Sequence, residues 1–168
     1  MKPLSTTMNG ATYVRVAQAA VGGADDTLVT LGLGSCVAIV LHDAGARVGG
    51  LAHVLLPEPA LSRDQGNANK FASTAVPALI QEMARLGARP GRLTARLVGG
   101  AAMFQGLMVP GSLNMGARNV IAAREALERA GIPVLGEDVG RDYGRSVRFH
   151  VGAGRTTVSS VGKTDVVL

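Results

Sequence analysis

Two side chains of this sequence, one cysteine and one histidine, have the types and spacing for nucleophilic chemistry. Cys36, the only cysteine, follows a glycine-containing turn, and His53 lies seventeen residues further on within an apolar run. An isolated thiol is mostly protonated at neutral pH, so a neighbouring imidazole that accepts its proton would raise the thiolate fraction. Two strands joined by a turn near 43–45 would bring both side chains together across a hairpin. The spacing therefore predicts a cysteine nucleophile with a histidine base.

Three neighbouring residues complete the predicted site. Thr30, on the preceding strand-like run, can accept a hydrogen bond from the second imidazole nitrogen and fix its tautomer, a role that a carboxylate more commonly fills. Gly34 and Ser35 form the turn before Cys36, where glycine permits unusual backbone angles and amide N–H groups can face a developing oxyanion. We expect Cys36, His53 and Thr30 to be catalytic, and Gly34 and Ser35 to set the oxyanion geometry.

Residue types alone leave a structural interpretation of this pair open. A single cysteine in a run rich in Val and Ile is commonly a small buried hydrophobe. A histidine on an apolar strand is commonly a core residue whose hydrogen bonds are satisfied. Only the placement of both around one turn favours catalysis.

Other sites receive less support from the sequence. The Gly-Leu-Gly at 32–34 resembles the start of a dinucleotide-binding fingerprint, but the next glycine is missing and strand-forming residues follow, so we discard it. The phosphate-binding pattern Gly-x4-Gly-Lys-Ser/Thr does not occur. His42 and His150 lack clustered ligand neighbours, so we expect no metal and no cofactor, with His42 at a strand end in solvent.

The elements that must position these residues are short and punctuated by glycine. The apolar patterns predict strands at 12–17, 28–33, 36–41, 47–55, 93–98, 133–139, 146–151 and 156–161, and helices at 69–86 and 116–130. Asn114 and Gly131 flank the second helix. Pro77 conflicts with the first helix, which must either kink there or start just before it. Strands before, between and after two helices predict an α+β fold with sheet layers flanked by helices.

Composition narrows the classes of protein. The 168 residues are 47% hydrophobic, with a mean hydropathy of +0.26, which favours one folded domain over disorder. There is no apolar run of membrane-spanning length and no signal-peptide pattern, and a lone cysteine allows no intrachain disulfide, so we expect a cytoplasmic protein without membrane insertion. The net charge of +5 comes with only two Tyr, three Phe and no Trp. We therefore expect an acidic protein partner rather than nucleic acid.

Four ordered segments resemble one known family. They contain Gly-Leu-Gly-Ser-Cys within 29–38, Ala-His-Val-Leu-Leu-Pro within 49–57, Gly-Gly-Ala-Ala-Met-Phe at 99–104 and Asn-Met-Gly-Ala-Arg-Asn-Val at 114–120. Together they are similar to the chemoreceptor glutamine deamidases, the CheD family, from about residue 12 to 162. The loop 105–113 is longer than in the shortest members, and Gly140-Arg141 stands where many members have Gly-Gly.

The resemblance implies a single glutamine deamidase domain over 1–168, with its core at about 12–162. It implies a sandwich of two mixed β-sheets flanked by helices, similar to the catalytic domain of cytotoxic necrotizing factors. It also implies Cys36 as nucleophile, His53 as general base and Thr30 as the orienting residue. The implied reaction is deamidation of glutamines to glutamate, with release of ammonia, on the cytoplasmic helices of methyl-accepting chemotaxis receptors.

Several functional questions stay open at this stage. Some family members bind and are regulated by a CheC-type phosphatase, and some hydrolyse receptor glutamate methyl esters. The alternatives are therefore a non-enzymatic regulator of such a phosphatase, or a methylesterase or other thiol acyl transfer at the same site. Arg118, Arg141 and Arg145 are candidates for steering acidic receptor helices, and Asn119 with Gly99-Gly100 is expected to shape the backbone near the site.

Overall fold

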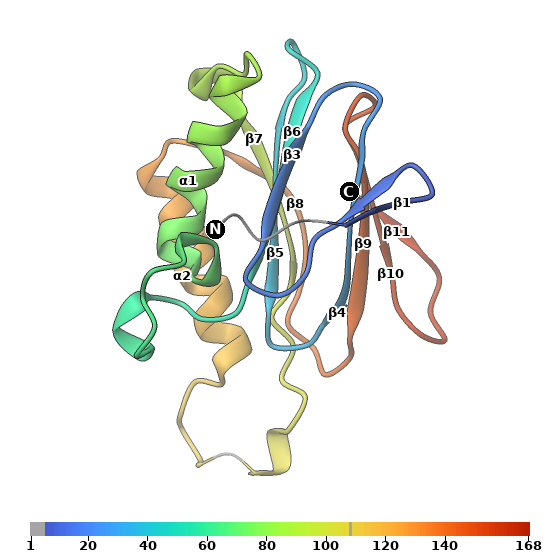
Figure 1. Ribbon diagram of the computed structural model, residues 1–168. Helices are drawn as coiled ribbons and strands as arrows, with labels where there is room; N and C mark the ends of the chain where they lie inside the picture. The colour runs from blue at the N-terminus through green and yellow to red at the C-terminus, as the bar shows by residue number, and fades with distance from the viewer. Residues whose placement is uncertain (1–5, 108) are drawn as a thin grey trace.

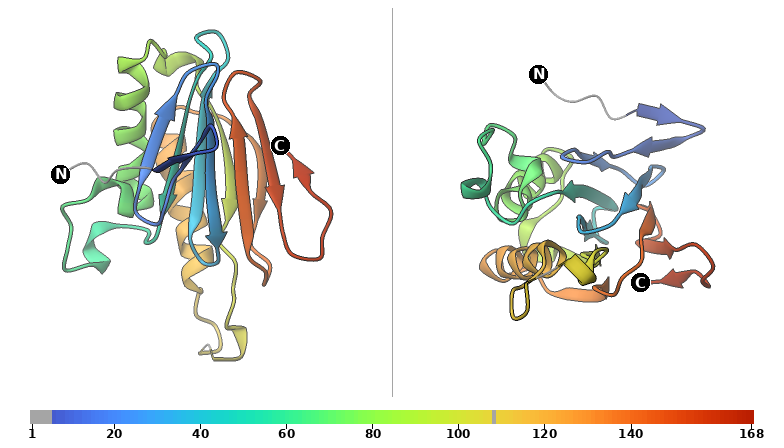
Figure 2. Two further views of the ribbon diagram at one scale, coloured as in Figure 1. Left: turned by 45° about the vertical axis from the view of Figure 1, so that its right-hand side comes forward. Right: turned by 90° about the horizontal axis from the view of Figure 1, so that it is seen from below.

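The computed structural model, which describes residues 6–107 and 109–168, shows two stacked β-sheets with two helices against one of them (Figures 1 and 2). The first sheet has the order β1 (Thr6–Met8), β2 (Ala11–Tyr13), β4 (Thr27–Leu33), β9 (Arg145–His150), β10 (Arg155–Ser159) and β11 (Val166–Val167). The second has the order β3 (Ala19–Gly22), β6 (Val48–Val54), β5 (Val37–Asp43), β7 (Thr94–Gly99) and β8 (Val134–Val139). β2 pairs with β4 and β7 with β8 in parallel, whereas the other printed pairs are antiparallel. The predicted α+β sandwich of two mixed sheets is confirmed.

Both long helices cover the outer face of the five-stranded sheet, so the layers are sheet, sheet and helix (Figure 1). They are α1 (Ala72–Arg85) and α2 (Met115–Arg129), and short 3-10 turns occur at Pro59–Leu61, Ala68–Lys70, Pro90–Arg92 and Gln105–Leu107. α2 begins where the Asn114 side chain accepts a hydrogen bond from the Ala117 N–H at 2.8 Å, which satisfies one of the free donors of its first turn. The helix cap predicted at Asn114 is thus confirmed.

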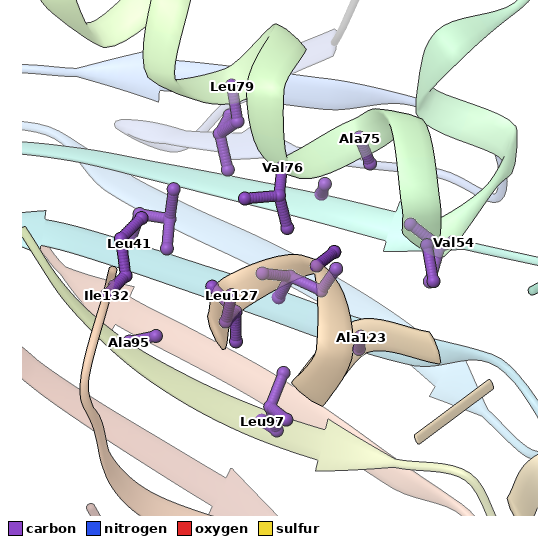
Figure 3. Close-up of a cluster of buried hydrophobic side chains, with 14 of the residues drawn as sticks. Leu41, Val54, Ala75, Val76, Leu79, Ala95, Leu97, Ala123, Leu127 and Ile132 are labelled. Atoms are coloured by element: carbon purple, nitrogen blue, oxygen red, sulfur yellow. The ribbon is translucent and has the colours of Figure 1, made fainter. Parts of the chain in front are cut away.

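Two cores lie on opposite faces of the central hairpin. Every residue of β5 and β6 is buried, because these strands are covered on both faces and read as continuous apolar runs. On the helix side, Leu41 and Val54 pack with Val76, Leu79 and Leu127 (Figure 3). On the other side, the alternate residues of the same strands, such as Ala38, Val40 and Leu51, pack against the six-stranded sheet in a second cluster that includes Phe149. The hairpin is therefore held rigidly from both sides.

Glycines let the two sheets and the helix approach the hairpin closely. A Cβ at Gly49 would collide with the ring of Phe149 on β9, and one at Gly50 would lie 2.8 Å from a Leu79 methyl group on α1. Neither position has room for a larger side chain. The Gly-Gly pair in β6 thus sets the spacing of all three layers at the end of the hairpin away from Cys36.

The first helix resolves the conflict raised by Pro77. α1 runs from Ala72 to Arg85 with Pro77 inside it, so the alternative in which the helix starts just before Pro77 is wrong. Pro77 lies on the exposed side of the helix. Because proline has no N–H, the Ser73 carbonyl loses its helical donor, but this carbonyl belongs to the first turn of the helix rather than to the deep core. The buried stripe is carried by other residues of α1, including Ala75, Val76 and Leu79.

Two other expectations need correction. The strand predicted at 12–17 ends at Tyr13, and the short strands β1, β3 and β11 were not predicted, because runs of two to four residues carry little periodicity. His42 was expected in solvent, but it is 7% exposed and its ring packs edge-on to Phe149, with 5.7 Å between the centroids. The partner ring comes from the opposite sheet, which the local sequence does not reveal.

Candidate active site

The structure brings Thr30 and His53 together from opposite sheets. Thr30 is on β4 of the six-stranded sheet and His53 is on β6 of the five-stranded sheet, and each is 1% exposed. Thr30 Oγ1 lies 2.7 Å from His53 Nδ1 and 2.6 Å from the carbonyl oxygen of Val14. The His53 backbone is fixed on the strand edge, where its N–H donates to the Gln18 carbonyl at 3.0 Å. The imidazole is therefore held both by its own strand and across the sandwich.

These two contacts determine the tautomer of His53. The single hydroxyl proton of Thr30 is donated to the Val14 carbonyl, which can only accept, so Oγ1 must accept from His53 Nδ1–H. A neutral imidazole with its proton on Nδ1 has an unprotonated Nε2. Among the described residues, His53 Nε2 is buried and has no hydrogen-bond partner. A free, correctly oriented acceptor of this kind is what a general base requires.

Cys36 occupies the turn immediately before β5, on the same face of the sheet as His53. In the β5–β6 hairpin, Ala38 pairs directly with His53, and side chains two residues apart on a strand point to the same face. Cys36 directly precedes the first ladder pair, Val37 and Val54, so it lies at the end of the hairpin that carries His53. Cys36 also belongs to the inter-sheet cluster that includes Ala38. Cys36 and His53 thus both lie on the side of the hairpin that faces the six-stranded sheet, while no hydrogen bond joins the sulfur to Nε2 among the described residues.

Burial keeps both groups of this pair neutral. Burial raises the pKa of the Cys36 thiol, and the backbone N–H of Cys36 partly opposes that rise. Burial lowers the pKa of His53 from its ordinary 6.5 to about 4. The expectation that the imidazole raises the resting thiolate fraction is therefore wrong. At neutral pH the arrangement is a thiol beside an unprotonated base, and the proton would move only when the sulfur attacks.

The glycine with the unusual backbone angles near Cys36 is not the one that was predicted. Gly34 has an ordinary φ, whereas Gly32 has φ +70° at an irregularity in the β4–β9 pairing between Thr30 and Leu33. The bulge places both Thr30 and Leu33 in the interior, although residues three apart on a regular strand face opposite sides. Gly34 matters for space, because a Cβ there would lie 3.4 Å from Met103.

Asn119, on α2, links the two strands that carry Cys36 and His53. Its Nδ2 donates to the Ser35 carbonyl at 2.9 Å and to the Leu55 carbonyl at 3.0 Å. The side chain is fully buried, and its Oδ1 has no partner among the described residues. The expectation that Asn119 shapes the backbone near the site agrees with these contacts, but its bridging position follows only from the fold.

The Gly-Gly pair at the end of β7 brings α2 against the cysteine turn. A Cβ at Gly99 would collide with the Cys36 carbonyl oxygen, and one at Gly100 would collide with Val120 of α2. Both glycines have positive φ, at +111° and +67°. The Gly100 N–H donates to the Cys36 carbonyl at 2.8 Å. The Cys36 carbonyl is thereby fixed, as expected for a pair that shapes the local backbone.

A pocket of about 490 Å³ opens beside Cys36. Its wall consists of the cysteine turn, the segment after β7 and the start of α2, with lining residues that include Gly34, Ser35, Met103, Phe104, Leu113 and Met115. Phe104 is 74% exposed and Leu113 is 63% exposed. The loop that carries them projects from the same end of the sandwich as the β4–β5 turn (Figure 1). This apolar rim was not singled out from the sequence, because a loop has no periodicity that marks its inner side.

The three candidate steering arginines differ in position, and Arg118 is partly buried on α2. Arg145 is 2% exposed, and it donates to the Asp138 carboxylate at 3.0 Å and the Gly140 carbonyl at 2.7 Å. It cannot steer a partner, and the expectation for it is wrong. Arg141 is exposed with φ +63°, the left-handed conformation that suits the glycine found there in many members of the family it resembles.

Comparisons with known proteins identify the family of this chain. The model of a family described as CheD chemotactic sensory transduction matches residues 55–160. A relative from Caldanaerobacter subterraneus subsp. tengcongensis, named “Probable chemoreceptor glutamine deamidase CheD”, is 45% identical over 89% of this chain and 92% of its own. One from Geobacter metallireducens, named “Probable chemoreceptor glutamine deamidase CheD 2”, is 50% identical over 76% of this chain and 79% of its own. The chain belongs to the CheD family.

CheD membership and the fold are thus established independently of the site. A solved structure of a Neisseria meningitidis protein of family DUF152 superposes with a TM-score of 0.50 at 14% identity, over 80% of this chain and 66% of that one, and it supports the fold alone. The matched CheD model begins after Cys36 and His53, so membership by that model does not assign their roles. None of the helices in residues 6–107 and 109–168 has the length and apolar character to span a bilayer.

Proposed function

We propose that this chain deamidates glutamine side chains of chemotaxis receptors, converting them to glutamate and ammonia. Cys36 is the nucleophile, His53 the general base and Thr30 the residue that orients it. The observation that carries the proposal is the unprotonated Nε2 of His53, which has no partner among the described residues, on the side of the hairpin where Cys36 lies next to its pocket. The names of the relatives give the same activity. The activity belongs to one domain over 1–168, with its core at about 12–162.

The first half of the reaction forms a thioester. The Cys36 sulfur attacks the carboxamide carbon while its proton passes to His53 Nε2, so that the thiolate never accumulates. The carboxamide oxygen becomes an oxyanion, for which the Cys36 N–H is an available donor, since no acceptor holds it among the backbone hydrogen bonds of the described residues. The tetrahedral species then expels ammonia, which takes the proton from His53.

The second half restores the enzyme. Water attacks the thioester carbon, and His53 Nε2 accepts the water proton. Collapse of the second tetrahedral species breaks the carbon–sulfur bond, leaves a glutamate carboxyl group and returns the proton to the Cys36 sulfur. Throughout, Thr30 accepts from Nδ1–H and so stabilises the imidazolium form each time that it appears. The net reaction adds one water and releases one ammonia.

The substrate is a glutamine on the cytoplasmic helices of a receptor, so this protein acts in the cytoplasm. The apolar rim at Met103, Phe104 and Leu113 gives the surface that meets the substrate around the reacting carboxamide. A CheC-type phosphatase, which the resemblance to the family implies, is the proposed regulatory partner.

The test is mass spectrometry of a receptor cytoplasmic fragment together with an ammonia assay. The protein should add about one dalton for each converted glutamine and release one ammonia with it. Cys36→Ala should abolish both signals, and His53→Ala should lower turnover by about 10²–10⁴-fold. The matched control is His150→Ala, which removes a histidine far from the pocket and should retain wild-type turnover. Full activity of Cys36→Ala would refute the nucleophile assignment.

The same preparation separates the alternative activities. A primary amine that becomes incorporated into the receptor fragment would indicate transglutamination, and release of methanol from methylated receptor would indicate ester hydrolysis on the same thioester route. Tight binding of a CheC-type phosphatase without any thiol-dependent turnover would favour a non-enzymatic regulator. When no primary amine is added and water is the only nucleophile, we expect ammonia release to be the main signal.

A further inference from the structure

We propose that Asn119 is a positioning residue that orients the Cys36 peptide and ties it to the strand of His53. The inference rests on the proposed function for its catalytic consequence, but its structural part stands on contacts alone. Asn119 Nδ2 reaches the Ser35 carbonyl and the Leu55 carbonyl at 2.9 and 3.0 Å. Asn119 is fully buried, in a site where an amide group would be costly without such partners.

The two carbonyls lie where the central hairpin opens. The β5–β6 pairing ends at Val37 and Val54, so Ser35 and Leu55 lie beyond the last ladder pair. From there β6 turns away, since the Leu55 N–H donates to the Lys70 carbonyl at 2.9 Å. The strand that bears the thiol and the strand that bears the base would otherwise separate at this point. One amide group of α2 spans the gap.

The bond to Ser35 also sets the direction of the Cys36 N–H. A trans peptide is planar, so its C=O and the following N–H point in opposite directions. Because the Ser35 carbonyl points to Asn119, the Cys36 N–H is turned away from it. That N–H acts to lower the pKa of the Cys36 thiol and is bound to no acceptor among the backbone hydrogen bonds of the described residues. Asn119 therefore holds a donor next to the reacting sulfur without touching the substrate.

The orientation of the amide follows from its partners. Both neighbours at hydrogen-bond distance are carbonyl oxygens, which accept only, so the NH₂ group must face them and Oδ1 must face the other way. The buried Oδ1 has no partner among the described residues. An apolar residue of the same size at this position would remove the donor from both the Ser35 and the Leu55 carbonyl, at a cost of about 1–3 kcal/mol for an acceptor left buried and unsatisfied. The geometry thus favours a role in arranging the two carbonyls.

The test uses Cys36 alkylation by iodoacetamide, which needs no receptor. Asn119→Leu keeps the volume and removes the donors, and Asn119→Ala removes them without added volume, so that two variants guard against misfolding of one. The control is Leu127→Ala, a buried α2 residue distant from the turn, which destabilises the core without removing the bridge. Circular dichroism and urea unfolding verify that each variant is folded under the assay conditions.

Both Asn119 variants should be alkylated about tenfold more slowly at neutral pH, with the rate profile moved to higher pH, because the donor to the sulfur is no longer fixed. His53 of β6 is the titratable side chain on the same face of the sheet as the sulfur. No charged residue within 6–107 and 109–168 lines the Cys36 pocket, so a change in the alkylation rate reports on the turn. In deamidation, kcat should fall roughly 10- to 100-fold with KM nearly unchanged.

Two results would overturn the inference. One is an alkylation profile of both Asn119 variants that equals that of the wild type. The other is an equal change in Leu127→Ala, which would make the effect a general loss of stability. If the alkylation profile moves as expected but the wild type shows no deamidation, the positioning role stands and the proposed function fails.

Discussion

The low pKa of His53 leads to a prediction about stability that does not depend on the reaction. Burial lowers the pKa of His53 from 6.5 to about 4, and the residue is 1% exposed. Below pH 6.5 the unfolded chain takes up a proton on this imidazole, whereas the native protein does not until about pH 4. At about 1.4 kcal/mol per unit of pKa difference, the free energy of unfolding should fall by about 3 kcal/mol between pH 7 and pH 4.

The sign follows from which state holds more protons. The unfolded state binds more protons between pH 6.5 and 4, so the stability that neutral His53 contributes is present above pH 6.5 and is lost as the pH falls through that interval. His42 and His150 also have lowered pKa values, mainly through burial, and they contribute with the same sign. A comparison of variants is therefore needed to isolate His53.

The assay is urea unfolding at pH 7, 6, 5 and 4 for the wild type and for His53→Gln, which keeps a polar side chain but cannot titrate. The wild type should lose about 3 kcal/mol more than the variant over this range. An equal loss in both proteins would show that His53 has the same pKa in the native and unfolded states. In that case the imidazole is neither buried nor held neutral, and the description of it as a ready base fails.

Two further substitutions test the site and its scaffold separately. Thr30→Val keeps the shape of the side chain but leaves His53 Nδ1–H and the Val14 carbonyl unsatisfied. It should lower the free energy of unfolding, measured with urea, by about 1–3 kcal/mol and the rate of ammonia release at least tenfold. Thr30→Ser should retain most of the stability and most of the turnover. Burial acts to raise the pKa of Asp43. Hydrogen bonds from the backbone N–H groups of Arg89 and Ala46 and from the Arg92 guanidinium outweigh that effect and hold this pKa at about 2. Asp43→Asn should therefore cost about 1–3 kcal/mol, since the charge left behind on Arg92 is partly in solvent. Turnover per folded molecule should be unchanged because Asp43 lies at the opposite end of β5 from Cys36; a normal unfolding midpoint would contradict this.

The part of the site that the sequence predicted is the part that is local in the chain. Cys36 and His53 lie on consecutive strands of one hairpin, whose turn and alternation are visible in the residues themselves. The α+β class follows in the same way from the order of apolar runs. Thr30 was placed correctly beside the imidazole, but the sequence did not show that it reaches His53 from the other sheet.

The parts that were missed or wrong depend on contacts between distant segments. The protonation states of Cys36 and His53 follow from burial between two sheets, which residue types do not reveal. Arg145 was taken for a surface charge because its partners, the Asp138 carboxylate and the Gly140 carbonyl, enclose it only after the loop folds back. The bridge from Asn119 joins backbone atoms 84 and 64 residues away, beyond any periodic signal.

The distribution of the site over three layers has a consequence for how its activity is lost. Cys36 directly precedes the five-stranded sheet and His53 lies in it, Thr30, which accepts from the imidazole, lies in the six-stranded sheet, and Asn119, which bridges the end of the hairpin, lies on α2. The Thr30–His53 hydrogen bond, at 2.7 Å, survives only while the two sheets keep their spacing, and hydrogen bonds weaken steeply with small displacements. A change that loosens the inter-sheet core should therefore free His53 Nδ1 and reduce turnover before the protein unfolds. Loss of packing on the outer face of the six-stranded sheet should have no such effect.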